Sequence, residues 1–424
     1  MTDRYYTLSL RERVGVRAGL VAAHAALTLT LSLWERGRVG VASVLFIAFN
    51  ASAATLSLGV IERADDERLA PARVELAYPG QPGGPIHHAV EMAVKEAQFE
   101  LDAAKLRVTI ELRSARSADD AKSLLQQLAR TGAVGVVLDL PATWIAAAAP
   151  SVSLPLINAG EPAESARSQT CLPHLFHTLP GERMRADAIA QALLARRWSR
   201  VLVLNGPSAD DAQRLAVAQA ALKRFGLKTT ATRPFKLSAD PRERDLANPL
   251  LLTGASAGGD YDAVWVVDSD GEFARTLPYR TALPRPVVGD AGLVALAWAP
   301  HFERYGAPQL ARRLMRAAQR PMTSVDWAAY MATKALLQAA LEQPAAPNAA
   351  QIVKALTRAD FTLDGFKGVR LSYRSWDHQL RQPLLLSDGA GVVGSAPVDG
   401  VMHPKNVLDT LGSDAGESAC KAAL

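Results

Sequence analysis

The sequence is poor in cysteine and lacks the short motifs that mark common catalytic and metal sites. Its 424 residues include only Cys171 and Cys420 as cysteines, without a CxxC pair, and nothing places histidines beside both of them. A structural zinc site is therefore disfavoured. No GxSxG, HExxH or Walker sequence occurs, and no GxGxxG follows a predicted strand. We expect a protein that is not an enzyme and that holds no metal and no cofactor.

The chain also lacks a concentrated basic patch. Its formal net charge is +5, but the first 38 residues hold six arginines and three acidic residues, which leaves about +2 for the remainder. The other basic residues are dispersed among acids, without interleaved aromatics. Because nucleic-acid binding needs clustered positive charge, this distribution disfavours a nucleic-acid partner.

No apolar run is long enough to span a membrane. The segment from Val39 to Phe49 is about half of the roughly 20 residues that a helix needs to cross a bilayer. Arg36 and Arg38 precede it, and an A-x-A site (residues 51–53) follows. This order is typical of a secretory signal peptide, so we predict export to the periplasm with cleavage near Ala53. The alternative is a buried helix.

Residues 1–37 contain an imperfect repeat, TLSLRERVGVR at 7–17 and TLSLWERGRVG at 30–40. Two copies of this length cannot bury a core. Our hypothesis is that they are translated upstream DNA and that the true start codon lies near residue 38. An unusually long n-region is the alternative.

After the leader, about 370 residues remain, which is enough for two domains of ordinary size. Short β-rich runs alternate with segments of helical periodicity, a pattern that predicts an α/β fold with doubly wound, parallel sheets. The expected strands are 55–61, 106–112, 133–138, 154–158, 200–205, 228–233, 263–267 and 286–288. The expected helices are 85–104, 117–131, 182–197, 208–225, 308–341 and 349–358.

Proline, glycine and serine interrupt this pattern at 160–182, 284–300 and 342–349. Such pauses indicate that the chain crosses between two lobes several times. We expect the following division: leader, 1–54; first lobe, 55–178 and 291–342; second lobe, 179–290 and 343–400; tail, 401–424.

Ligands of open α/β sheets bind beyond the carboxyl ends of the strands, so the loops that follow the strands are the candidate site. In the first lobe these residues are Glu62, Arg63, Asp139, Leu140, Pro141, Ala142, Ala159, Gly160 and Glu161, and in the second they are Pro207, Ser208, Asp268, Ser269, Asp270 and Asp290. The carboxylates could accept hydrogen bonds from a hydroxyl or an amine. Turn formation is the alternative, because turns favour aspartate and glycine as well. His87 and His88, on a predicted helix without an acid at ligand spacing, are interpreted as a solvated or capping pair.

Three stretches resemble type I periplasmic binding proteins of the branched-chain amino-acid group: SADDAKSLLQQLARTGAVGVVLD, WSRVLVLNGPSADDAQRLAVAQAALKRFGLK and FKGVRLSYRSWDHQLRQPLLL. More narrowly, ERYGAPQLARRLMRAAQRPMTSVDWAAYMATKAL together with SWDHQLRQPLLL looks like binding proteins associated with pyrroloquinoline-quinone-dependent (PQQ-dependent) alcohol dehydrogenase systems. The resemblance implies two lobes with a three-crossover hinge, a monomer that closes on a small-molecule ligand, and an ABC permease as partner. A periplasmic sensor or partner of an alcohol-oxidation system and a degenerate enzyme are the alternatives.

The candidate loops depart from the amino-acid-binding pattern. Where such relatives offer serine, alanine and threonine to a ligand carboxylate, this chain has Asp139 and Glu161. Negative charge would repel a carboxylate, so ordinary amino acids are doubtful ligands. Asp290 stands where those relatives place the acid that pairs with an ammonium, which leaves an amine or a polyol.

Several late residues are interpreted as structural. Asp377, His378 and Gln379 are expected to bridge strands near a crossover, and the tryptophans at 298, 327 and 376 are expected to pack within the lobes.

Two expectations concern tertiary contacts. Asp139 and Glu161 should face Asp268 and Asp290 across the space between the lobes. A disulfide between Cys171 and Cys420 should tie the tail to the first lobe, and two buried thiols are the alternative.

Overall fold

The computed structural model describes residues 53–420, apart from 238–239, 241, 243–247, 253–258 and 344–345. The expected leader, with its repeat and signal peptide, lies outside the described residues except for Ala53 and Ala54. The last four residues of the expected tail, 421–424, also lie outside them.

The first lobe is built on a five-stranded sheet, in which every neighbouring pair is parallel and the order is β2-β1-β3-β4-β5. Its strands are β1 (Ala54–Arg63), β2 (Leu106–Ala115), β3 (Ala133–Asp139), β4 (Leu156–Asn158) and β5 (Leu175–His177). Four were predicted, and β5 was not, because it lies within the stretch 160–182, where proline, glycine and serine interrupt the pattern.

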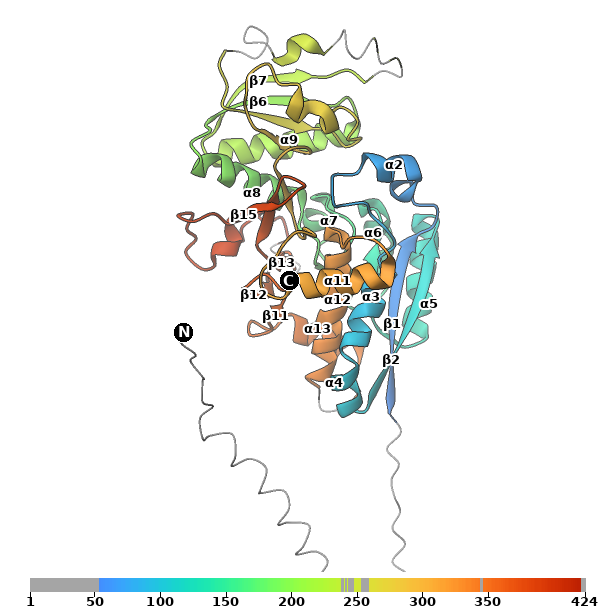
Figure 1. Ribbon diagram of the computed structural model, residues 1–424. Coiled ribbons are helices and arrows are strands. Elements are labelled where there is room, and N and C mark those ends of the chain that lie inside the picture. The colour runs from blue at the N-terminus through green and yellow to red at the C-terminus, as the bar shows by residue number, and fades with distance from the viewer. Residues whose placement is uncertain are drawn as a thin grey trace, which may run out of the picture. The chain divides into compact units, whose positions relative to one another are not determined.

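The helices of the first lobe come from two distant parts of the sequence. The early ones are α3 (His87–Glu96), α4 (Gln98–Ala103), α5 (Ala118–Arg130) and α6 (Ala142–Ala148), and the late ones are α11 (Ala307–Ala318), α12 (Ser324–Leu341) and α13 (Ala349–Leu356). Helix α12 packs against α3 and β3, and Figure 1 shows these late orange helices beside the blue N-terminal elements. One core therefore joins the two parts.

The expected helix 308–341 is two helices. Helix α11 ends where Gln319 adopts a left-handed φ of 56°. Helix α12 then starts with a capping box, in which Thr323 and Asp326 exchange side-chain and backbone hydrogen bonds. Pro321 lies between the two ends and cannot supply a backbone N–H to continue α11.

The second lobe contains a four-stranded parallel sheet with the order β7-β6-β8-β9. Its strands are β6 (Arg200–Asn205), β7 (Lys228–Pro234), β8 (Ala263–Val267) and β9 (Val287–Gly289). Helices α8 (Glu182–Ala195) and α9 (Ala209–Arg224) pack on it. A small antiparallel sheet of β10 (Val294–Leu296), β14 (Leu384–Ser387) and β15 (Val392–Ala396) packs against α8 in the same core.

The remaining elements are short. They are η1 (Glu67–Leu69), α2 (Pro71–Leu76), η2 (Ala149–Ser151), α7 (Ser165–Ser168), η3 (Pro249–Leu252), η4 (Ala274–Tyr279), β11 (Leu363–Asp364), β12 (Arg370–Tyr373), β13 (Leu380–Arg381) and η5 (Val407–Thr410). Strands β11, β12 and β13 form an antiparallel sheet.

The chain passes between the two cores three times, between β5 and α8, between β10 and α11, and between β13 and β14. The fold class predicted from the sequence, two α/β lobes with parallel sheets, is confirmed. The expected division at residues 342 and 343 does not hold, because Ile352, Leu371 and Leu380 pack in the first-lobe core. Apolar side chains of α13 and β11–β13 complete the surface of α12, which is buried on nearly every side.

Cys171 and Cys420 form a disulfide, with 5.3 Å between their Cα atoms. The predicted pairing is thus present in the structure. It attaches the end of the tail to the segment between α7 and β5 of the first lobe.

Candidate functional site

The predicted first-lobe loops meet at one edge of the sheet. Strands β1, β3 and β4 are parallel neighbours, and Glu62 pairs in register with Asp139. The carboxyl ends of parallel strands share an edge, so the loops after these strands lie side by side. The local fold therefore brings together the residues that the sequence singled out there.

Asp139 is paired with an arginine. Its two carboxylate oxygens lie 2.8 Å from Nη2 of Arg68, which also contacts Asp66 at 2.5 Å. Burial raises the pKa of the Asp139 carboxyl, and the Arg68 guanidinium opposes that rise. A Cβ at position 160 would lie 1.8 Å from Asp139 Oδ1, so Gly160 leaves room for this ion pair.

Glu62 binds the start of a helix instead of remaining available to a ligand. Its Oε1 accepts a hydrogen bond of 2.9 Å from the backbone N–H of His87, and the His87 ring lies 3.1 Å from Oε2. The sequence had left His87 without an acid partner; β1 supplies one from 25 residues away. A carboxylate at the N-terminus of α3 satisfies an unpaired N–H and complements the helix dipole.

Glu161 is also engaged within its own lobe. Its Oε2 accepts a 2.9 Å hydrogen bond from the N–H of Ala142, the first residue of α6, and its Oε1 accepts one of 2.8 Å from Ala163. Pro141 is the N-cap of that helix, and Leu140 and Ala159 are buried in the core. The helix N–H that could hold a ligand carboxylate is thus occupied by a carboxylate of the protein.

Arg63 differs from these neighbours. It forms no ion pair with any described residue, and its Nε is buried without a hydrogen-bond partner among them. Burial lowers the pKa of the Arg63 guanidinium, and the nearby carboxylates of Asp139, Asp66 and Glu161 oppose that effect. Arg63 is therefore the cation at this edge with capacity to bind another group.

In the second lobe the predicted loops also converge. Asp290, after β9, accepts a 2.8 Å hydrogen bond from the N–H of Asp268, after β8, and lies 3.1 Å from Arg214 of α9. Ser208 and Ser269 place their hydroxyl oxygens 3.1 Å apart.

The start of α9 draws two of these loops together. Asp211 accepts hydrogen bonds from the N–H groups of Ser208 and Ser269, at 3.1 and 2.7 Å. Ser208, predicted as a ligand residue, caps α9, and Pro207 is exposed beside it.

Among the acids of the second-lobe loops, Asp268 can still accept a hydrogen bond from another group. Its Oδ2 accepts a 2.8 Å hydrogen bond from Ala274, whereas its buried Oδ1 has no hydrogen-bond partner in the described part of the chain. Burial raises the pKa of the Asp268 carboxyl, the backbone N–H groups of Ala274 and Gly271 oppose that rise, and the negative charges of Asp290 and Asp211 add to it. A donor from a bound molecule would satisfy this oxygen.

One ion pair connects the two groups of loops. Arg73 of α2, on the first-lobe side, contacts Asp270 in the loop after β8. Tyr78 adds a second link, because its hydroxyl donates to the carbonyls of Gly292 and Ser387 at 2.7 and 2.9 Å. The sequence analysis did not single out Arg73 and Tyr78, because neither directly follows a strand. The one local signal nearby was Pro71, since proline is common at the first position of a helix.

The expected facing of Asp139 and Glu161 toward Asp268 and Asp290 stays a prediction. The hydrogen bonds and ion pairs of these four residues lie within their own lobes. A small cavity of about 30 Å³ touches Asp290 together with Glu182 and Arg214.

Larger cavities lie elsewhere. One of about 700 Å³ is lined by residues 301–305, 367–369 and 392–395 and touches none of the predicted site residues. We place the candidate site at the strand ends, because ligands of open α/β sheets bind there and the predicted polar groups converge there. No cluster of three metal-ligating side chains occurs in the described ranges, and no helix there is long and apolar enough to cross a membrane.

Among the residues interpreted as structural, His378, Gln379, Trp298 and Trp327 are buried as expected. The His378 ring stacks on Phe176 with centroids 4.4 Å apart, and Gln379 donates to the carbonyls of His177 and Leu179. The rings of Trp298 and Trp327 stack within the first-lobe core.

Neither a protein-family model nor a curated protein matches the sequence. Solved structures match in fold. A branched-chain amino-acid ABC transporter periplasmic ligand-binding protein from Burkholderia xenovorans has a TM-score of 0.67 and 15% identity, over 87% of this chain and 100% of that one.

Two further matches were solved with ligands. An ABC transporter substrate-binding protein from Desulfitobacterium hafniense, in complex with Leu, has a TM-score of 0.60 and 15% identity over 79% of this chain and 98% of that one. A solute-binding protein from Rhodopseudomonas palustris, in complex with 3,4-dihydroxybenzoic acid, has a TM-score of 0.57 and 13% identity over 78% and 92%. This chain has the type I periplasmic binding protein fold.

Proposed function

We propose that this protein is the exported solute-binding component of an ABC importer, which closes its two lobes on a small molecule and delivers it to a membrane permease. The observation that carries the proposal is a fold match that covers the whole of a periplasmic ligand-binding protein. The two cores and three crossings also provide the hinge that such closure needs. The proposal that the protein is exported rests on the sequence before residue 54, which is typical of a signal peptide.

The geometry favours an uncharged or cationic ligand that donates hydrogen bonds. In the first lobe, Glu161 occupies the N–H of Ala142 and would repel a ligand carboxylate. In the second lobe, a buried oxygen of Asp268, close to Asp290, has no hydrogen-bond partner among the described residues. An amine or a polyol would satisfy that oxygen, and the Arg63 guanidinium could donate a hydrogen bond to a hydroxyl or carbonyl oxygen of the ligand.

The narrower assignment, a binding protein linked to PQQ-dependent alcohol oxidation, rests on the sequence resemblance of residues 303–336 and 375–386. The hydroxyl groups of an alcohol-derived polyol could donate a hydrogen bond to the buried Oδ1 of Asp268, which lacks a partner among the described residues. In this assignment the ligand is a solute related to that oxidation system or its cofactor.

Mass spectrometry of small molecules released by denaturing the purified protein tests the proposal. A thermal-shift panel of L-leucine, 3,4-dihydroxybenzoate, polyols and diamines should accompany it, since a ligand at 100 times its Kd stabilises the folded state by about 2.7 kcal/mol. We expect polyols or amines to raise the Tm and L-leucine to leave it unchanged. If no compound is released and none shifts the Tm, the solute-binding proposal is wrong. A shift with L-leucine alone would overturn the ligand class.

A further inference from the structure

The C-terminal segment 401–420, here called the strap, lies on the second lobe after β15. The N–H of Gly412 donates to Asp187 of α8 at 2.8 Å, and Arg224 of α9 donates to the Gly412 carbonyl at 2.8 Å. Gln191 of α8 contacts the hydroxyl of Thr410 at 3.2 Å. Leu411 is fully buried in the second-lobe core. The middle of the strap is therefore docked on that lobe.

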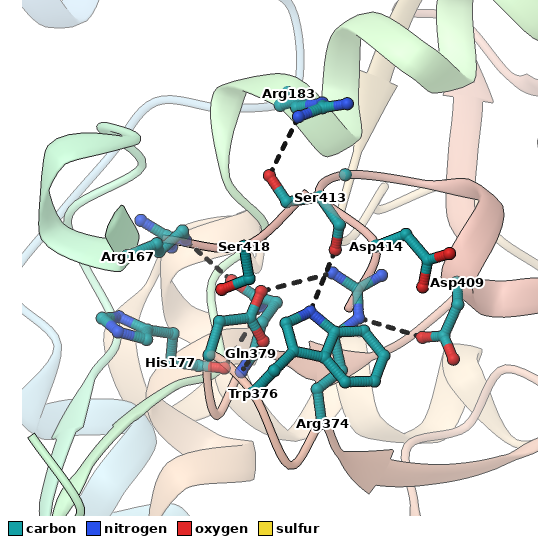
Figure 2. Close-up of polar contacts among 12 residues, drawn as sticks. Arg167, His177, Arg183, Arg374, Trp376, Gln379, Asp409, Ser413, Asp414 and Ser418 are labelled. Carbon is teal, nitrogen blue, oxygen red and sulfur yellow. Dashed lines mark hydrogen bonds and ion pairs between the residues drawn. The ribbon is translucent and has the colours of Figure 1, made fainter. Parts of the chain in front are cut away.

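The same part of the strap is bound by the segment that connects β12 to β13 in the first-lobe core. Arg374 donates to Asp409 at 3.0 Å and to the Leu411 carbonyl at 2.5 Å, as Figure 2 shows in part. Trp376 donates from its indole nitrogen to the Ser413 carbonyl at 3.1 Å. Residues 409–413 thus touch elements from both sides of the hinge.

The end of the strap returns to the first lobe through the disulfide. Between Gly412 and Cys420, Ser413 and Glu417 both bind Arg183 at the start of α8, at 3.1 and 2.6 Å. Arg183 follows the first crossing directly, and Cys420 is bonded to Cys171 before β5. A cavity of about 260 Å³ lies under this end, lined by residues of α7, of the start of α8, of the segment between β12 and β13, and of the strap.

Undocking the strap would expose an arginine that is held inside the protein. The Arg374 side chain is 1% exposed, and its nearest carboxylates are Asp409 of the strap and Asp377 at 3.6 Å. A buried guanidinium that loses its main partner is costly, so strap and hinge should loosen together. The disulfide opposes that event because it keeps the strap end at high effective concentration near its docking site.

From these contacts we propose that the strap is a fourth connection between the lobes and that the Cys171–Cys420 disulfide locks it, which makes the mobility of the hinge sensitive to reduction. This inference deepens the proposed function, because lobe motion is what a solute-binding protein uses to trap its ligand. In an oxidising compartment the lock is closed. Reduction leaves the strap held by non-covalent contacts alone.

Amide hydrogen exchange of the full, ligand-free protein tests the proposal, with and without a phosphine reductant. We expect reduction to accelerate exchange at 408–414 and at the hinge amides of His177 and Arg374 by about tenfold or more, the scale expected when a tethered contact loses its tether. Amides in β3 and β8 should not change. The double variant Cys171→Ser, Cys420→Ser is the matched control: it should resemble the reduced protein and ignore the reductant.

Unchanged exchange at 408–414 after reduction would overturn the lock. Faster exchange there with unchanged hinge amides would overturn the coupling to the hinge. Equal acceleration in β3 and β8 would mean that the disulfide only stabilises the whole fold, and would overturn the proposal as well. Because no ligand is present, these outcomes are independent of the ligand panel, and reduction of the unmodified chain remains decisive if the variant does not fold.

Discussion

The two lobes place acidic residues at the same topological position and use them differently. In the first lobe Asp139 pairs with Arg68, Glu62 binds the start of α3, and Glu161 binds the start of α6. In the second lobe Asp268 keeps one buried oxygen without a partner among the described residues.

The difference shows that position at a strand end is not enough to make a carboxylate a ligand-binding group. An acid whose oxygens are all satisfied by its own lobe supports the structure, and its removal should cost stability. An acid with an unsatisfied buried oxygen costs stability itself and can gain from a ligand.

The largest expected effect is on the first lobe. Asp139→Ala would remove one of the two buried carboxylates that pair with Arg68. It should lower the free energy of unfolding by about 2 kcal/mol, below the range for a fully buried pair because Arg68 is 38% exposed and keeps Asp66 as a partner. Urea unfolding at pH 7 measures this. Asp139→Asn, which keeps the shape, is the matched control and should cost less. A loss under about 0.5 kcal/mol for Asp139→Ala would mean that the pair is not structural.

The second lobe should respond in the opposite way. Asp268→Asn removes a buried charge while an amide oxygen can still accept from Ala274, so the free energy of unfolding should stay the same or rise by about 1 kcal/mol. Affinity for the ligand found by mass spectrometry should fall roughly tenfold, or about 1.4 kcal/mol. Titration calorimetry measures it. Equal affinity in variant and parent would remove Asp268 from the site.

The pH dependence of stability should differ between the unmodified protein and the Asp268→Asn variant. Burial raises the pKa of Asp268 above its ordinary value of 3.8, so the folded state binds this proton more tightly than the unfolded state. The contribution of Asp268 is therefore most favourable below pH 3.8 and is lost as the pH rises through the folded-state pKa. Asp268→Asn should gain stability relative to the parent over that rise. If the free energies of unfolding of the parent and the variant differ by a constant amount from pH 4 to pH 7, the pKa of Asp268 is not raised.

The smallest effect should come from making the first lobe resemble amino-acid-binding proteins. Glu161→Ala exposes the N–H of Ala142, at a cost of about 1 kcal/mol for a lost helix cap. The variant should gain a small Tm increase with L-leucine that the parent lacks. Asp66→Ala, which removes a nearby acid but leaves α6 capped, is the control. No gain would show that Glu161 is not what excludes a carboxylate.

Much of the architecture could be predicted from periodicity. Strands β1, β3, β6 and β8 lie within a few residues of their expected bounds, because buried parallel strands read as continuous apolar runs between turn residues. The boundary near residue 343 could not be predicted in this way. Helix α13 has an apolar face whichever lobe it joins, and only packing against α12 and β3 assigns it.

For the candidate site as well, some features could be predicted from the sequence and others could not. The sequence by itself determined that acids follow the strands and that two cysteines could pair, since residue type and strand order are local properties. Tertiary structure alone decided that Arg68, the N–H of Ala142 and the N–H of His87 satisfy the first-lobe acids, that Arg73 reaches Asp270, and that the strap joins both lobes. The physical reason is that a hydrogen bond depends on which groups meet in space, and these partners lie from 19 to 225 residues apart.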